Sequence, residues 1–271
     1  MIKGEITMPT LGFIGTGNMG GALARAAAKK KENLVLLTNR TQAKAEALAA
    51  QIGGRAVTPE ACAAQADYLF LGVKPQMLPG LCETLAPLLW ERKDRFVLVT
   101  MAAGTSREKL LGLLGLELPV IRIMPNTPAS IGQGMILYSP GADVTEAEEA
   151  AFVEAMAGAG RFLKLEEKLI DAGSALSGSG PAFVDLFLEA LADGGVACGL
   201  PRKQAIELAA QTLLGSAALC LETGKHPGEL KDAVCSPGGT TIQGVRALEE
   251  RGFRGAVIEA VIRTYEKNLK L

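Results

Sequence analysis

A glycine-rich turn near the start of the chain constrains the fold more than any other feature. The residues Gly15-Thr16-Gly17-Asn18-Met19-Gly20 have the spacing GxGxxG. They follow an apolar run, Leu11–Ile14, that is typical of a buried strand, and they open an alanine-rich segment, Asn18–Lys31, that is typical of a helix. In such units the first glycine permits a tight turn, the second lets the backbone approach a pyrophosphate, and the third lets helix and strand pack closely. We therefore expect the turn to bind a dinucleotide.

Apolar runs alternate with amphipathic stretches through the first 165 residues. Each run is apolar on successive residues, as expected for a parallel sheet that helices cover on both faces. The pattern predicts an α/β fold in which residues 1–165 form a doubly wound, Rossmann-like parallel sheet. The predicted elements after the turn are strands over Leu34–Thr38, Tyr68–Val73, Phe96–Met101 and Val120–Ile123, and a helix over Gln42–Gln51.

Strand-like runs disappear after about residue 165, which predicts a second, all-helical domain over residues 166–271. Small residues between Ala190 and Ala197 would let helices approach closely, either at a subunit interface or within one chain. The predicted helices cover Leu169–Ala197, Ala205–Glu222, Pro227–Ala233 and Gly244–Leu269.

Composition and charge exclude several classes of partner. The chain has 28 basic and 29 acidic residues, so no basic excess favours nucleic acid or an anionic membrane. No apolar stretch approaches the ~20 residues that span a bilayer, and the start, Met1–Pro9, lacks the apolar run of a signal peptide. The 5 cysteines are scattered and never spaced as CxxC, which favours free thiols in the cytoplasm. With His226 as the only histidine, neither a catalytic triad nor a metal site is expected.

The residues after the second predicted strand indicate which nicotinamide cofactor binds. An NAD enzyme usually has Asp or Glu there, bonded to the ribose 2′-hydroxyl. This chain has Thr38-Asn39-Arg40-Thr41 instead. Arg40 can pair with a 2′-phosphate while its neighbours donate hydrogen bonds. NADPH is therefore the expected cofactor, with NADH used at lower efficiency; the alternative makes Arg40 a solvated residue that caps the next helix.

A second cluster of glycines and hydroxyls lies late in the chain, at Gly238-Gly239-Thr240-Thr241. It links the short helix Pro227–Ala233 to the helix that follows. A glycine-rich turn at a helix N-terminus offers free N–H donors suited to a carboxylate. The alternative is a capped turn between two helices.

Five segments together resemble the pyrroline-5-carboxylate reductase family. They occur in the family's order and span the chain from Phe13 to about Gly255. The late segment, the PNTPA run and the SGSGPA run are specific, whereas the first glycine-rich segment alone is not. The segments are FIGTGNMG at Phe13–Gly20, GVKPQ at Gly72–Gln76, RIMPNTPA at Arg122–Ala129, ALSGSGPAF at Ala175–Phe183 and LKDAVCSPGGTTIQGVRALEERG at Leu230–Gly252.

The resemblance implies an activity and an assembly. Members of the family reduce 1-pyrroline-5-carboxylate to L-proline, the final step of proline biosynthesis, usually with NADPH. Their helical domains intertwine into a homodimer, or into a higher oligomer built from dimers. The substrate lies between the cofactor domain and the helical domain.

The resemblance also implies site residues. Backbone N–H groups in the turn from Gly238 to Thr241 would hold the substrate carboxylate, namely those of Gly239, Thr240 and Thr241. The Thr241 hydroxyl would face the ring nitrogen, and Glu167 would supply negative charge near it, which makes these two the expected catalytic residues. Further residues that line the dinucleotide would be Val73, Lys74, Pro75, Ala102, Ala103 and Gly104, and Thr58 stands where many relatives have Asn.

The cleft after the last predicted strand should also contact substrate, through Met124, Pro125 and Asn126. A structural Asx-turn is the alternative for Asn126. The alternatives for Thr241 and Glu167 are a helix N-cap and a solvated carboxylate.

Reduction of a C=N bond fits the residues that the chain has. A protonated imine already carries its proton, so no strong general acid is needed, in agreement with the absence of a catalytic histidine. Two other functions stay open at this point. One is a reductase of a six-membered cyclic imine or a 2-hydroxy acid, and the other is a non-catalytic NADP-binding module.

Overall fold

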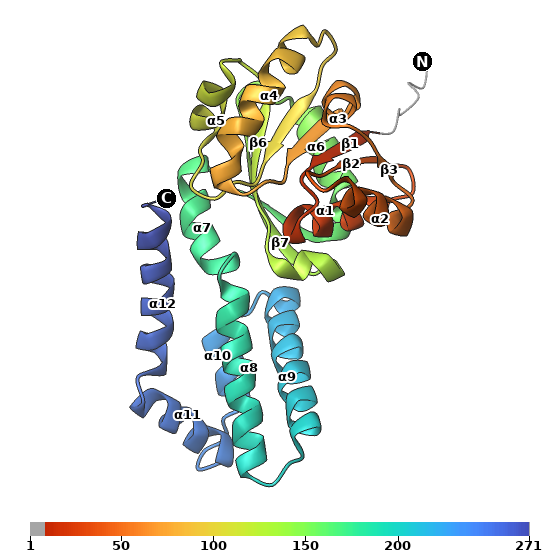
Figure 1. Ribbon diagram of the computed structural model, residues 1–271. Coiled ribbons are helices and arrows are strands. Elements are labelled where there is room, and N and C mark those ends of the chain that lie inside the picture. The colour runs from red at the N-terminus through yellow and green to blue at the C-terminus, as the bar shows by residue number, and fades with distance from the viewer. Residues whose placement is uncertain (1–8, 271) are drawn as a thin grey trace, which may run out of the picture. The chain divides into compact units, whose positions relative to one another are not determined.

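The computed structural model describes residues 9–270 and separates into two compact units (Figure 1). The first contains residues 9–179 and 265–270, and the second contains Gly180–Thr264. The predicted division at residue 165 falls inside the first unit, because helix α7 (Ile170–Ser177) packs Ile170 against Met124 and Leu137 of the sheet. The first eight residues, where no signal peptide is expected, lie outside the described range.

One sheet organises the first unit. It is parallel from β3 through β6; β7 runs antiparallel to β6, and β8 is parallel to β7. The parallel α/β sheet is confirmed, whereas β3, β7 and β8 are strands that the sequence did not predict. In spatial order the strands are β3 (Arg55–Ala56), β2 (Leu34–Thr38), β1 (Thr10–Ile14), β4 (Tyr68–Leu71), β5 (Val97–Thr100), β6 (Val120–Met124), β7 (Gly134–Pro140) and β8 (Gly160–Lys164).

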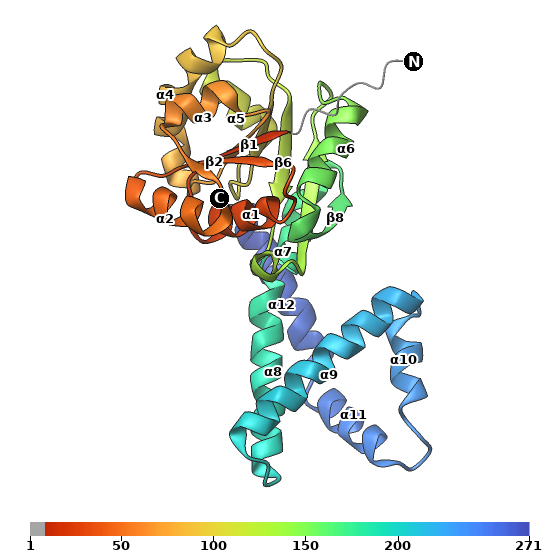
Figure 2. The same ribbon diagram turned by 90° about the vertical axis from the view of Figure 1, so that its right-hand side faces the viewer.

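Helices cover both faces of this sheet, as the continuous apolar strands require (Figure 2). One face packs against α1 (Asn18–Ala28), α2 (Gln42–Ile52) and α6 (Glu146–Ala155), and the other against α3 (Pro59–Gln65), α4 (Leu78–Glu91) and α5 (Arg107–Leu114). Phe13 of β1 stacks on Phe70 of β4 with ring centroids 4.3 Å apart, at the centre of the first face. Short 3₁₀ turns complete the unit: η1 (Pro75–Met77), η2 (Thr127–Ile131), η3 (Ala157–Ala159) and η4 (Glu167–Leu169).

The second unit is helical, as predicted, but two of the predicted helices are each divided into two. The predicted helix Leu169–Ala197 is two helices, α7 and α8 (Gly180–Ala197), because Pro181 cannot continue a helix from Ser177. The predicted helix Gly244–Leu269 is α11 (Thr240–Glu250) and α12 (Phe253–Asn268), separated at Gly252, which has φ of 71°. The other two are α9 (Arg202–Thr223) and α10 (Pro227–Ala233).

Small residues let α8 and α9 approach closely. Ala192 of α8 packs against Ala205 and Ala209 of α9 in a small core. For Ala192 this supports the expectation of packing within one chain. Much of the apolar surface of these helices stays exposed, including Leu186 (68%) and Leu214 (60%).

Helix α9 departs from one sequence-based expectation. It is 22 residues long and apolar enough to cross a membrane by length and composition. The expectation that no apolar stretch approaches the length of a membrane span is therefore wrong for Arg202–Thr223. A single such helix is weak support for a membrane span, because helices of soluble proteins pass the same test.

Candidate functional site

The carboxyl ends of β1, β2 and β4 meet at one edge of the sheet. The N–H of Gly15, after β1, donates to the carbonyl of Thr38 at the end of β2 (2.9 Å). The N–H of Gly72, after β4, donates to the carbonyl of Ile14 (2.8 Å). Parallel sheets bind ligands at this edge, where the strand order reverses. The glycine-rich turn therefore lies where a dinucleotide is expected.

Three glycines at this edge touch backbone to backbone. A Cβ on Gly20 would collide with the carbonyl oxygen of Gly15, and a Cβ on Gly72 would lie 2.5 Å from the same atom. Gly15 itself has φ of 99°, a conformation that suits glycine. Gly72 was not among the predicted cofactor residues, although its place between a buried strand and Val73 could have identified it.

Gly17 is in a different environment from its neighbours. A Cβ there would meet no protein atom within 4 Å, so the space over Gly17 is open. Gly17 is also the N-cap of α1 and offers no side-chain cap, which leaves the first N–H groups of the helix free for an anion. The Thr16 hydroxyl, next to it, is buried without a hydrogen-bond partner. Open space and unpaired donors fit a pyrophosphate.

The loop after β2 holds the residues that were predicted to select NADPH. Asn39 accepts a hydrogen bond from the Thr16 N–H (3.3 Å) and donates to the Thr41 carbonyl (3.2 Å), so it ties this loop to the glycine-rich turn. Arg40 is exposed, and no carboxylate pairs with it among residues 9–270. Thr41, not Arg40, is the N-cap of α2. The Arg40 guanidinium is thus available to a phosphate.

The remaining predicted cofactor residues follow β4, β5 and β3. Val73 is half-buried, whereas Lys74 and Pro75 are exposed where η1 begins. Ala102, Ala103 and Gly104 form the loop after β5, in which Gly104 has φ of 66°. Thr58 caps helix α3, since its hydroxyl accepts a hydrogen bond from the Ala61 N–H (3.2 Å). These positions are compatible with the predicted contacts, which stay predictions.

Asn126 holds the turn after β6. Its side-chain oxygen accepts from the Met135 N–H (2.9 Å), and its amide nitrogen donates to the Ser177 carbonyl (3.0 Å). The neighbouring Met124 and Pro125 are buried. Both polar atoms of Asn126 therefore serve the fold, through distant partners and not through the Asx-turn that was the alternative interpretation. A substrate contact by these three residues stays a prediction.

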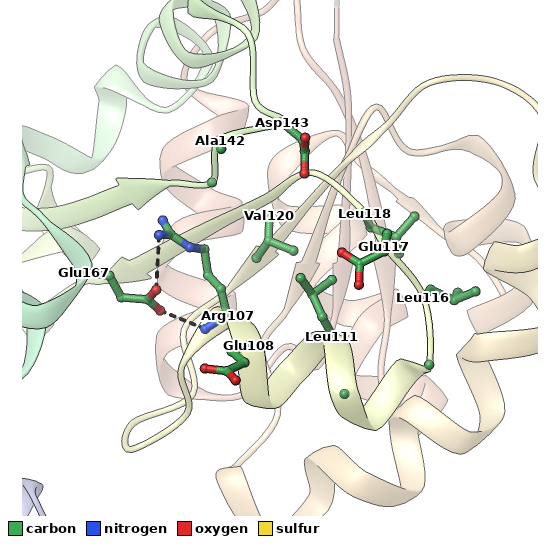
Figure 3. A pocket seen from close by; sticks show the side chains of 13 residues that line it. Arg107, Glu108, Leu111, Leu116, Glu117, Leu118, Val120, Ala142, Asp143 and Glu167 are labelled. Atoms are coloured by element: carbon green, nitrogen blue, oxygen red, sulfur yellow. Dashed lines mark hydrogen bonds and ion pairs between the residues drawn. The ribbon is translucent and has the colours of Figure 1, made fainter.

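Glu167 is paired with two arginines. Its carboxylate accepts a hydrogen bond from the Arg107 N–H (2.7 Å), lies 3.1 Å from the Arg107 guanidinium and 3.7 Å from that of Arg122. Glu167 and Arg107 line a pocket of about 550 Å³ beside α5. Figure 3 shows the two side chains together at one end of it. Neither arginine is among the predicted site residues, although Arg122 is a charged residue inside an apolar strand and so requires a partner.

The late glycine-rich turn opens helix α11. Gly238 has φ of 67°, and Gly239 is the N-cap, so Thr241 is not the cap that the alternative interpretation proposed. The Gly239 N–H donates to the Ser236 carbonyl (3.0 Å) and closes the turn. Thr240 and Thr241 are exposed at the first two helical positions, where N–H groups have no acceptor within the helix. Two of the three predicted N–H donors are therefore free for a carboxylate.

Two family models match separate parts of the chain. A family model described as pyrroline-5-carboxylate reductase dimerisation matches residues 167–271. Another, described as NADP oxidoreductase coenzyme F420-dependent, matches residues 10–104. The two models thus cover the helical region and the dinucleotide edge of the sheet.

Full-length relatives and solved structures extend the match. The chain is 43% identical to a pyrroline-5-carboxylate reductase of Glycine max, over 97% of this chain and 96% of that protein. It is 42% identical to the reductase of Escherichia coli K12, over 96% and 97%. The structure of a pyrroline-5-carboxylate reductase from Coxiella burnetii superposes with a TM-score of 0.89 at 30% identity, over 97% of this chain and 98% of that one. A Plasmodium falciparum pyrroline carboxylate reductase with NADP bound gives 0.84 at 28% identity, with the same coverage of both chains.

Proposed function

Because this chain belongs to the pyrroline-5-carboxylate reductase family, we propose a division of its residues between cofactor and substrate. The enzyme reduces 1-pyrroline-5-carboxylate to L-proline with NADPH. The observation that carries the activity is identity above 40% over nearly the whole length of reductases that perform it.

The cofactor side is the carboxyl edge of the sheet. NADPH, when bound, supplies the hydride. The chain's own contribution is to hold and orient it: the N-terminus of α1 at Gly17 takes the pyrophosphate, and Arg40 pairs with the 2′-phosphate. Asn39 holds the loop after β2 against the glycine-rich turn, because its side chain accepts a hydrogen bond from the Thr16 N–H. The loop Ala102–Gly104, which follows β5 at the same edge, would line the dinucleotide.

The substrate side is the N-terminus of α11. The free N–H groups of Thr240 and Thr241 bind the substrate carboxylate. The Thr241 hydroxyl accepts a hydrogen bond from the protonated imine and orients the ring. With the ring so oriented, the carbon of the C=N group would accept the hydride, and the π electron pair would move to nitrogen, which would become the neutral amine. The pairing of Glu167 with two arginines favours a supporting role over direct contact with that nitrogen.

The quaternary structure that we propose is a homodimer through the helical unit, or a higher oligomer of such dimers. The matched dimerisation family and the exposed leucines of α8 and α9 support it. We also propose a cytoplasmic location, because all 5 cysteines are free thiols. Sedimentation of the purified protein and fractionation of cells that express it would test both.

A steady-state assay tests the function. NADPH oxidation should be fast with 1-pyrroline-5-carboxylate and at least tenfold less efficient, in kcat/KM, with the six-membered cyclic imino acid. Equal efficiency would redefine the substrate class as cyclic imino acids in general. NADPH binding without oxidation of either compound would support the non-catalytic alternative.

A further inference from the structure

An ion-pair network of two arginines and two acidic residues joins the start of α5 to β6, η4 and α7. Its centre is Arg122 of β6, which is 3% exposed. The Arg122 guanidinium lies 2.7 Å from the Asp171 carboxylate and 3.7 Å from that of Glu167. A buried guanidinium is costly unless carboxylates compensate it. The network, which Arg107 completes, is neutral overall, so its geometry can persist inside the fold.

Glu167 links this network to the start of α5. Arg107 is the first residue of that helix, where an N–H has no acceptor within the helix. Ser106, the N-cap, accepts from the Lys109 N–H and leaves the Arg107 N–H to Glu167 (2.7 Å). A carboxylate at a helix N-terminus is also favoured by the helix dipole. Glu167 and the Ser106 cap therefore hold the first turn of α5 together.

Arg107 also ties the start of α5 to the sheet. Its guanidinium donates to the carbonyl of Ser139 (2.9 Å) and to that of Pro140 (2.6 Å), at the end of β7. Figure 3 shows this side chain reaching from α5 while Glu167 meets both its backbone and its guanidinium. The start of α5 is thus held from two sides.

The loop that ends at the first residue of α5 contains three of the predicted cofactor residues, and we call it the cofactor loop. Residues Met101–Ser106 connect β5 to α5 and include Ala102–Gly104. Within the loop, the Thr105 N–H donates to the Ala102 carbonyl at 3.3 Å, which is a long hydrogen bond. The Ala102 N–H donates to the Thr100 hydroxyl at 3.4 Å, and the Lys109 ammonium donates to the Gly104 carbonyl at 3.5 Å. These bonds are also long, and the second comes from α5 itself. The position of Ala103 and Gly104, between the buried Ala102 and Thr105, therefore depends on where α5 begins.

We propose that Glu167 is a positioning residue for the cofactor loop. It acts through the N–H and guanidinium of Arg107, and its carboxylate does not face the substrate nitrogen. The inference rests on the proposed function, which places Ala102–Gly104 against NADPH. Loss of Glu167 frees the start of α5 and weakens NADPH binding, while the chemistry at saturating NADPH continues.

Two substitutions at Glu167 test the inference. Glu167→Gln keeps the length of the side chain and an oxygen that accepts from the Arg107 N–H, whereas Glu167→Ala removes both. In the full-length enzyme, Glu167→Ala should raise the Kd and KM for NADPH roughly tenfold, with kcat within twofold of wild type. Glu167→Gln should keep the Kd within about threefold. Glu166→Ala is the matched control, since Glu166 is exposed and pairs with Lys168; it should change neither constant.

The opposite pattern would overturn the proposal. If both Glu167 variants lose kcat equally and bind NADPH normally, the carboxylate acts on the substrate. If neither variant changes the Kd, the loop needs no anchor, and the proposal also fails. Binding is measured by NADPH fluorescence without substrate, so a wild type that failed to reduce 1-pyrroline-5-carboxylate would refute the function and leave this test intact.

A variant at Arg107 covers the case in which Glu167→Ala does not fold. Arg107→Ala keeps the backbone N–H and so keeps half of the anchor. It should raise the Kd for NADPH about threefold, with kcat unchanged. An unchanged Kd in this variant would count against the proposal by itself.

Discussion

Gly17 and Gly20 belong to the same turn, but their surroundings differ. The space over Gly17 is open, whereas a Cβ on Gly20 would collide with Gly15. We expect Gly17→Ala to unfold in urea like wild type but to bind NADPH at least tenfold more weakly, because its methyl group occupies the cofactor's place. Gly20→Ala should lose about 1–3 kcal/mol of the free energy of unfolding. Urea titration measures the free energy of unfolding of each variant, and NADPH fluorescence measures its binding. Equal losses of stability in the two variants would contradict the assignment of open space to Gly17.

Arg40 should decide between the two nicotinamide cofactors. Charged hydrogen bonds of ~1.5–3 kcal/mol predict that Arg40→Ala loses roughly ten- to a hundredfold in kcat/KM with NADPH. Efficiency with NADH should change far less, because NADH has no 2′-phosphate. Arg25→Ala, at an exposed position in the last turn of α1, is the control. Equal losses with both cofactors would mean that Arg40 does not bind the phosphate.

Thr241 is the residue that we expect to contact the reacting nitrogen. Thr241→Val keeps the shape and removes the hydroxyl, so kcat should fall roughly ten- to a hundredfold while the Kd for NADPH stays constant. Gly239 already caps α11, and the substitution should therefore leave the helix intact. Thr84→Val, which removes a hydroxyl bonded to the Gly80 carbonyl, serves as the control. An unchanged kcat would exclude the hydroxyl from the reaction.

At the scale of elements, the sequence predicted five of the eight strands. It missed the two-residue β3 at one edge of the sheet and both β7 and β8 on the other side. Strands β1, β2, β4, β5 and β6 are continuous apolar runs. By contrast, β7 begins at Gly134 and ends at Pro140, both of which are typical of turns, and β8 is largely exposed. Local patterns identify strands that are buried on both faces and miss strands whose pairing depends on distant partners.

Contacts between residues that are distant in sequence were also missed at the site. The strand ends predicted which loops gather at one edge, since all carboxyl ends of parallel strands lie there. The pairing of Glu167 with Arg107 and Arg122 joins residues that are far apart in sequence, and only the fold brings them together. The residue types were visible in the sequence, but the contacts were not.

Helix α6 supplies a prediction about acid stability. The Arg95 guanidinium bonded to Glu148, together with Thr145, lowers the pKa of Glu148 to about 2, against a usual value of 4.5. Because the pKa is depressed in the fold, this pairing stabilises the protein above about pH 4.5 and is lost as pH falls toward 2. Glu148→Gln should therefore cost about 1 kcal/mol in urea unfolding at pH 7.

The cost of Glu148→Gln should shrink as the pH is lowered from 4.5 toward 2, because the wild-type carboxyl is then protonated too. Glu146→Gln, in the first turn of the same helix, is the control and should show little cost at either pH. A cost that does not change with pH would show that the charge of Glu148 contributes nothing.

For the whole molecule, the exposed apolar surface of the helical unit predicts self-association. Leu214 of α9 is 60% exposed, and only 11% of the residues in the most apolar 18-residue stretch of this helix are buried. We expect sedimentation to give a particle of at least twice the 28.2 kDa chain mass. Leu214→Glu should reduce the mass toward that of one chain. A Lys203→Glu control changes an exposed charge at the start of the helix and should leave the mass unchanged.

A different partner for α9 would give a different result. A wild-type chain that sediments alone at micromolar concentration would contradict the dimer. Partition of the protein into the detergent phase would instead indicate that α9 meets lipid.

The contact among Gly15, Gly20 and Gly72 limits how this enzyme can change during evolution. Where a large side chain meets another, a harmful substitution can be rescued by a smaller residue on the other side. Here each position already has the smallest residue that exists, and the atoms that a new methyl group would meet belong to the backbone. No second substitution at these positions can make room for the first. The three glycines should therefore be inherited together, with no intermediate sequence through which any one of them could be exchanged.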